Sequence, residues 1–297
     1  MYNYYVILYL KYEKGKEKVM FVDIKDVTRN KICVREYKGE GFLATAKSYA
    51  CEGYDAVALT RQGEYTPEAE NLLPVCEYKI GNPKSTDGEF TLLGLGMTSD
   101  PELPDWESMI KTSSSKACEA IKMIHQRNGY AVLCGCISHK NIPDEILRLE
   151  GLDAIEVANP ERGENGEASL LCDALARMGK PLHLVASGEE YLGGICVEAR
   201  EADQQSIIRA LNAGRFYSSE GDVEAHISQL PSGRIQLTCT AAKKIEFFTD
   251  SDEENSRVFE GEDLVFAEYV PLDSERFIRA EVTDNSGKRA WTNYIEV

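Results

Sequence analysis

One stretch decides the fold predicted for this chain: Gly53-Tyr54-Asp55-Ala56-Val57-Ala58-Leu59-Thr60-Arg61-Gln62. Residues 56–59 are an apolar run of strand length, with Asp55 before them and a polar cluster from Thr60 after them. Such a run is typical of a buried strand in an α/β protein, and the C-terminal end of the strand opens on a site. The stretch therefore predicts a buried strand whose C-terminal end, from Thr60 onward, opens on a site.

Short apolar strands alternate with amphipathic helices from about residue 18 to residue 218. The expected strands are 19–24, 56–59, 73–80, 91–95, 131–133, 154–157, 182–186 and 195–198, and the expected helices are 41–53, 113–128, 143–149, 167–178 and 203–211. This alternation predicts parallel strands with helices outside, either as a barrel or as an open sheet. The sequence has no Gly-x-Gly-x-x-Gly or Walker A motif, so the barrel is favoured over a nucleotide-binding open sheet.

The pattern changes after Ser218. Residues 223–228, 235–240, 245–248, 264–269, 277–283 and 290–295 read as short strands, separated by turns such as Pro231-Ser232-Gly233. With no helical pattern between them, these strands predict a small antiparallel sheet or sandwich. We therefore expect two domains, residues 1–220 and residues 221–297.

Composition excludes several classes of partner. The net charge of −17 over 297 residues argues against nucleic acid and anionic membrane surfaces, because phosphate binding needs a dense basic surface. No run approaches the ~18 apolar residues of a membrane span, and the N-terminus lacks the features of a signal peptide. Nine scattered cysteines suggest buried free thiols in a reducing compartment. We expect a cytoplasmic protein.

The opening stretch resembles a signature of the PHP family (polymerase and histidinol phosphatase) of metal-dependent phosphoesterases, Gly-Tyr-Asp-Ala-Ile-Ala-Ile-Thr-Asp-His. Two later segments agree in order and spacing. Arg215-Phe216-Tyr217 resembles the Gly-Arg-x-Tyr step at the end of that barrel, and residues 279–284 with 290–293 resemble the closing segment, although Tyr294 replaces a usual proline. The resemblance implies an α/β fold: a distorted TIM-like β/α barrel followed by a small antiparallel β domain.

The same resemblance indicates where metal ligands would lie. The first motif, Asp-Leu-His-x-His-Thr, falls on residues 23–28, and the second falls on residues 60–62. The former metal-site positions are then Lys25, Val27, Arg61, Gln62, Glu77, Phe90, Gly135, Gly188 and Glu190. Only Glu77 keeps a family ligand, and one carboxylate cannot hold a cluster of two or three metal ions. We therefore expect no metal, no cofactor and a catalytically degenerate member of the family.

Lys25 and Arg61 bring positive charge to former ligand positions. A buried Glu77 needs such a partner, so one of the two should lie within salt-bridge reach of it, Arg61 being the better candidate. The pair is either a stabilising plug or a pocket for a small anionic ligand, which would fit a binding or scaffold role. The alternative function is an active metal-dependent phosphoesterase with atypical ligands.

Other chemical interpretations stay open but are weaker. Cys134-x-Cys136 with Cys172 or Cys196 could form a soft-metal site, although structural thiols fit a buried strand better. His139 could have moved into a ligand role, and His125 could simply favour a helix C-terminus. Ser187 or Ser113 as a nucleophile lacks an assignable partner. The remaining candidates for a paired-carboxylate site are Glu77, Glu189 and Glu190.

Overall fold

The computed structural model describes residues 5–10, 18–23, 28–36, 54–60, 63–69, 72–81, 88–106, 108–137, 139–159, 164–187, 194–199, 201–251 and 257–297. The helices in this part are α2 (Ser113–His125), α3 (Pro143–Leu147), α4 (Ala168–Arg177) and α5 (Gln204–Asn212). None of the described helices is both long enough and apolar enough to span a bilayer. The predicted helix 41–53 lies outside the described residues.

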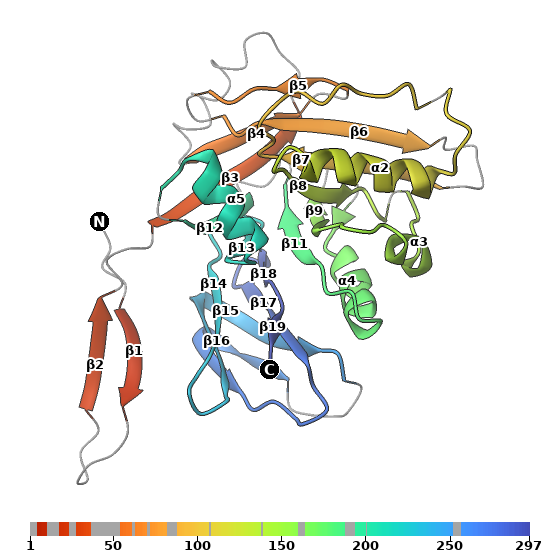
Figure 1. Cartoon of the computed structure of the whole chain (residues 1–297). Helices are drawn as coiled ribbons and strands as arrows, with labels where there is room; N and C mark the ends of the chain where they lie inside the picture. The colour runs from red at the N-terminus through yellow and green to blue at the C-terminus, as the bar shows by residue number, and fades with distance from the viewer. Residues whose placement is uncertain are drawn as a thin grey trace.

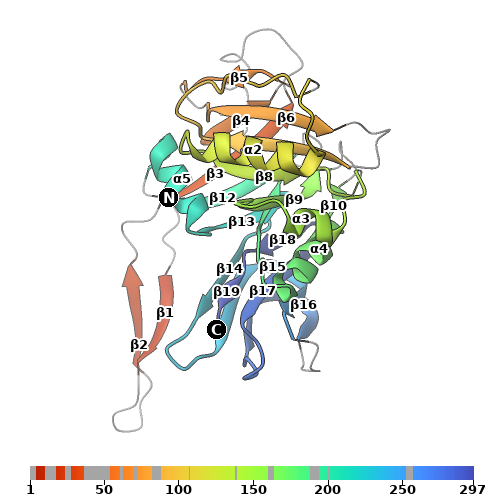
Figure 2. The same cartoon turned by 45° about the vertical axis from the view of Figure 1, so that its right-hand side comes forward.

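An antiparallel hairpin of β1 (Tyr5–Leu10) and β2 (Lys18–Asp23) stands apart from the rest of the chain in both views (Figures 1 and 2). The strand predicted at 19–24 therefore exists as β2. Its expected role as the first strand of the barrel is wrong, because β2 pairs with β1 in a separate two-stranded sheet.

A seven-stranded sheet forms the upper part of the molecule in Figure 1. Its strands are β5 (Tyr65–Thr66), β6 (Val75–Gly81), β7 (Glu89–Leu95), β8 (Tyr130–Cys134), β9 (Ala154–Asn159), β10 (Glu164–Asn165) and β11 (His183–Ala186). The order is β10-β9-β8-β7-β6-β5, with β11 also on β9. β8, β9 and β11 run parallel, whereas β5 to β8 alternate in direction.

The prediction of an all-parallel sheet is thus wrong for β6, β7 and β8, and the reason lies in the connections. Residues 82–88 between β6 and β7 are too few for a parallel crossover, which needs roughly a dozen residues or more. Between β7 and β8, a long segment leads to α2, and α2 brings the chain back to the end of β7. Leu95 consequently pairs with Tyr130, and β8 runs antiparallel to β7.

A ten-stranded sheet holds the remaining strands. They are β3 (Thr28–Glu36), β4 (Ala56–Thr60), β12 (Gly194–Ala199), β13 (Phe216–Ser219), β14 (Ala225–Gln229), β15 (Ile235–Thr249), β16 (Val258–Tyr269), β17 (Phe277–Asp284), β18 (Arg289–Thr292) and β19 (Ile295–Glu296). The described residues after 221 form strands and no helix, as predicted, but β15 is one bulged strand where two were expected. Pairing of β13 with β18 continues the sheet across residue 220, where the domain boundary is predicted.

β4 pairs in parallel with β3, a strand that the sequence analysis did not predict. The register joins Glu36 to Thr60, so Glu36 ends the strand beside the opening stretch, whereas Thr28 starts that strand at the opposite end. Thr28, the last residue assigned to the first motif, therefore does not lie at the strand end next to Thr60. The prediction for Thr28 depended on β2 being the neighbour of β4.

Closure into a TIM-like barrel is not confirmed, because neither large sheet closes on itself within the described residues. The two sheets instead face each other across a shared core. That core includes Ile32 and Ala58 from one sheet, Leu93 and Val132 from the other, and Ile207 from α5. A second core lies under α2, α3 and α4, which cover the opposite face of the seven-stranded sheet (Figure 1).

Local signals explain where the two best-defined helices begin. Asp203 caps α5 by accepting a hydrogen bond from the Ser206 amide, as predicted. Thr112, rather than Ser113 or Ser114, caps α2 through the Ser115 amide. After α2, the left-handed residue is Asn128, with a φ of 56°, because asparagine tolerates this conformation better than most residues with a Cβ.

Candidate functional site

The C-terminal ends of the three parallel strands β8, β9 and β11 lie at one edge of the seven-stranded sheet. Ligand and catalytic sites of α/β proteins form at this kind of edge. Gly135 directly follows β8, Asn159 ends β9, and Ser187 directly follows β11. The edge is therefore the first place to look for a site, and it includes the predicted positions around residues 134–136.

Glu156 is the centre of a buried hydrogen-bond network at this edge. Its Oε1 accepts hydrogen bonds from Asn159 Nδ2 at 2.9 Å and from the Ser187 hydroxyl, and its Oε2 accepts one from the Gly135 amide at 3.2 Å. Asn159 Nδ2 also donates to Ser187 Oγ at 3.0 Å. The three side chains are at most 5% exposed. Both carboxylate oxygens of Glu156 are thus engaged by protein donors.

A second buried carboxylate lies beside this network. Glu164 is fully buried, and its Oε1 accepts a hydrogen bond of 2.8 Å from the Ile137 amide. Burial, followed by the charges of Glu164 and other acidic groups, raises the pKa of the Cys136 thiol well above its usual value. A neutral thiol is a poor metal ligand, because soft metals bind the thiolate. Cys136 packs in the core under the helices and Cys134 in the core between the two sheets, so the two thiols do not converge.

Glu77 lies on the inner face of the sheet, and Phe90 lies on the other. Glu77 pairs with Leu93 and Lys79 pairs with Thr91, so Glu77, Leu93 and Thr91 share one face. Phe90 packs in the core under the helices. The two former metal-site positions consequently do not converge. Glu77 is 4% exposed, so the expected burial of this carboxylate is confirmed.

His139 lies closer to this edge than a surface loop residue would. Its Nε2 is 3.1 Å from Thr91 Oγ1, and its Nδ1 is 3.5 Å from Glu89 Oε1. The side chain is 22% exposed. Thr91 shares the face of Glu77, so His139 reaches the inner side of the sheet end, where a ligand role was considered.

Ser187 has a partner that the sequence did not indicate, namely Glu156. At 3% exposure it is part of the buried network. Ser113 is the first residue of α2 and is 6% exposed. Six predicted positions and one further candidate lie outside the described residues: Lys25, Val27, Arg61, Gln62, Gly188, Glu190 and Glu189.

The metal centre implied by the family resemblance does not fit the described residues. Within them, no group of three or more His, Cys, Asp or Glu side chains is arranged to hold a metal ion. Glu77 and the end of β8 supply one carboxylate and a glycine, and Glu156 accepts hydrogen bonds from protein donors at both of its oxygens.

Sequence reasoning missed Glu156, Asn159 and Glu164. One signal was present, because Glu156 interrupts the apolar run of residues 154–158 and Asn159 follows it. A charged residue inside a buried strand needs a partner. Which partner it has could not be inferred, since Ser187 and Gly135 are 31 and 21 residues away in sequence.

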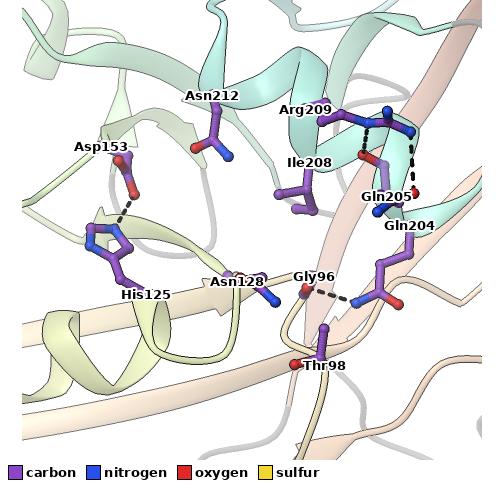
Figure 3. Close-up of a pocket in the computed structure, with 11 residues that line it drawn as sticks. Gly96, Thr98, His125, Asn128, Asp153, Gln204, Gln205, Ile208, Arg209 and Asn212 are labelled. Carbon is purple, nitrogen blue, oxygen red and sulfur yellow. Dashed lines mark hydrogen bonds and ion pairs between the residues drawn. The ribbon is translucent and has the colours of Figure 1, made fainter.

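A second concave feature lies at the opposite end of the parallel strands. A cavity of about 650 Å³ is lined there by residues of the α2 end and of α5 (Figure 3). His125 Nε2 lies 2.8 Å from Asp153 Oδ2, which also accepts the Ala131 amide at 2.7 Å. The hydrogen bond to Asp153 raises the pKa of His125 above its usual value.

This ion pair predicts a pH dependence. A raised pKa in the folded state adds stability that is present below the ordinary histidine value of about 6.5 and is lost as pH rises through the raised pKa. We expect the melting temperature to fall over this range in the natural protein, and to fall less in His125→Gln. Thermal melts from about pH 6.5 upward, with NMR titration of the imidazole, measure this. A His125 pKa at or below its ordinary value would contradict the interpretation.

Comparison with protein-family profiles and with curated proteins found no match. Among solved structures, the chain is similar to a two-domain protein from Bacteroides vulgatus ATCC 8482 that contains a predicted PHP-like metal-dependent phosphoesterase. The TM-score is 0.46 and the sequence identity is 14%, with 95% of this chain and 100% of that chain covered.

Proposed function

We propose that this chain is a PHP-like protein whose phosphoesterase centre has degenerated, and that it binds a ligand or partner without metal catalysis. The support from the sequence is the loss of family ligands at all but one of the former positions. Glu77 keeps its carboxylate, whereas Phe90 and Gly135 stand where histidines are expected. The proposal includes an anion site anchored by Arg61. Lys25 is the second predicted member of that site.

The observation that carries the proposal is the set of hydrogen bonds that the Glu156 carboxylate accepts. A carboxylate that ligates metal must present a lone pair to the ion, and its geometry is usually supported by outer hydrogen bonds. Glu156 accepts three hydrogen bonds, from Asn159, Ser187 and the Gly135 amide, so protein donors engage both of its oxygens. This arrangement satisfies the charge with protein donors, in the way that a buried carboxylate is stabilised without metal.

One observation favours the alternative, an active metal-dependent phosphoesterase with atypical ligands. His139 and Glu89 lie side by side at the same sheet end as Thr91, and imidazole with carboxylate is a common ligand pair. Two such groups would need further ligands to hold a hydrolytic metal ion. The degenerate centre therefore remains the proposal that the geometry supports better.

Metal content and phosphoesterase activity test the two functions. After incubation with Mn²⁺ or Zn²⁺ and desalting, we expect far less than one metal ion per chain by mass spectrometry. We also expect no hydrolysis of p-nitrophenyl phosphate above the blank. Glu77→Gln and His139→Gln serve as matched variants, and neither should change the metal content. Stoichiometric metal that is lost in either variant, together with activity, would establish the alternative function.

A further inference from the structure

The cavity at the N-terminal ends of the parallel strands is built from two helices and a turn. Gly129 precedes β8 and Asp153 precedes β9, so the cavity lies at the end of the sheet opposite the Glu156 network. α5 lies lengthwise along it and contributes Gln205, Ile208 and Asn212 among its lining residues. These positions share one face of the helix.

Arg209 provides the positive charge of this cavity. Its Nε donates to the Gln205 carbonyl at 3.2 Å and its Nη2 donates to Gln205 Oε1 at 3.3 Å. These bonds orient the guanidinium, which has five donor hydrogens in all. Nη1 has no hydrogen-bond partner among the described residues. An oriented guanidinium with remaining donors is suited to a phosphate or a carboxylate.

Asp153 lies across the cavity from Arg209, with Ile208 between them (Figure 3). Its Oδ2 is occupied by His125 and by the Ala131 amide. Its Oδ1 accepts no hydrogen bond within the described part of the chain. The Asp153 side chain is 23% exposed, so a ligand can reach it. This oxygen is positioned to accept a hydrogen bond from a hydroxyl group.

Two amides complete the set of polar groups. Asn128, in the turn after α2, and Asn212, at the end of α5, both line the cavity. Neither side-chain amide makes a hydrogen bond to any described residue. Each amide offers both donors and acceptors, a combination that matches the hydroxyl groups of a polyol. Ile208 supplies an apolar surface for the carbon skeleton.

We propose that this cavity binds a small polyhydroxylated anion, a phosphorylated or carboxylated sugar, with its anionic group at Arg209 and its hydroxyl groups at Asn128, Asn212 and Asp153. The volume of about 650 Å³ is within the range of small-molecule sites and far larger than inorganic phosphate needs. Among the described lining residues there is no Phe, Tyr or Trp, so the large aromatic surfaces on which a nucleobase commonly stacks are missing. Because the chain carries a net charge of −17, anion binding here depends strongly on Arg209.

This inference does not rest on the proposed function. The cavity and the sheet edge that holds Glu156 are at opposite ends of the parallel strands, so either proposal can fail alone. The phosphoesterase assay does not test ligand binding in the cavity, and the sugar-binding assay does not test whether the metal centre has degenerated.

Isothermal titration calorimetry on the full chain tests the inference with four probes: glucose 6-phosphate, gluconate, glucose and inorganic phosphate. We expect glucose 6-phosphate or gluconate to bind more tightly than either glucose or inorganic phosphate. Arg209→Ala should weaken the binding of the anionic sugar by about tenfold to a hundredfold, the range for a charge-assisted hydrogen bond. Asn212→Ala should weaken it by about tenfold.

Arg215→Ala is the matched control, because Arg215 is an exposed arginine close to α5 that does not line the cavity. It should leave the affinity unchanged. Circular dichroism confirms that each variant is folded. Absence of binding by both anionic sugars, or binding that Arg209→Ala and Asn212→Ala leave unchanged, would overturn the proposal.

Discussion

Replacing Arg279 with alanine is expected to destabilise the fold by about 3–5 kcal/mol, since the change breaks a fully buried ion pair from one side. Arg279 is completely buried, and its Nε and Nη2 donate to the two oxygens of Asp173 at 2.7 and 2.6 Å. Nη1 donates to Glu281 at 2.7 Å. The guanidinium also packs over Phe248 at 4.1 Å from the ring centroid.

The loss of stability is large because Arg279→Ala leaves the buried carboxylate of Asp173 without its counter-charge. Asp173 belongs to α4 and Arg279 to β17, so the pair joins the helix layer to the C-terminal strands. Without Arg279, the carboxylate of Asp173 stays buried, and the Tyr294 hydroxyl is its remaining hydrogen-bond donor among the described residues. Leaving a buried charge without a counter-charge is far more costly than losing an exposed ion pair.

Urea unfolding of the natural protein, of Arg279→Ala and of a control variant measures the change in the free energy of unfolding. Arg234→Ala is the matched control, because Arg234 pairs with Glu268 at 2.9 Å while its side chain is 54% exposed. We expect a loss within about 1 kcal/mol for this exposed pair. A loss of similar size for Arg279→Ala would show that the buried pair does not stabilise the junction.

The second large effect is expected for Glu156→Leu, which should lower the free energy of unfolding by roughly 3 kcal/mol or more. The substitution removes the acceptor for the Ser187 hydroxyl, the Asn159 amide and the Gly135 backbone amide, all at a buried site. Each buried donor left without an acceptor costs about 1–3 kcal/mol. Glu156→Gln should have an intermediate effect, because it keeps one acceptor oxygen and places a new donor near the Gly135 amide.

Chemical denaturation in the presence of EDTA provides the measurement, with the exposed Glu201→Leu as the control of unchanged stability. EDTA itself should not alter the natural protein if Glu156 is stabilised by protein donors. An EDTA-dependent loss of stability that disappears in Glu156→Leu would instead identify this carboxylate as a metal ligand and contradict the proposed function.

The sequence predicted most local elements because their signals are local. The apolar run at 56–59 is β4, Asp203 caps α5 as expected, and the period-two pattern after Ser218 is a series of strands. Propensity, capping and burial patterns act between neighbouring residues, so they can be read without knowing the fold. The burial of Glu77 also followed from its place in an apolar strand.

Prediction of the candidate site was less successful, and particular residues show why. Phe90 was grouped with Glu77, but strand alternation places it on the opposite face of the sheet. The strand predicted at 19–24 was expected to open the barrel next to β4, whereas β3 is the described neighbour of β4. A shift of one strand, or of one residue within a strand, moves a side chain to a different end or face.

What the sequence determined by itself is therefore the kind and order of most elements. Tertiary structure alone decided that β6, β7 and β8 run antiparallel, that Glu156 is satisfied by Ser187 and Gly135, and that a cavity forms between α2 and α5. These features depend on which distant segments meet. A buried charge or an open cavity is stabilised by partners from other elements, and no local pattern specifies those partners.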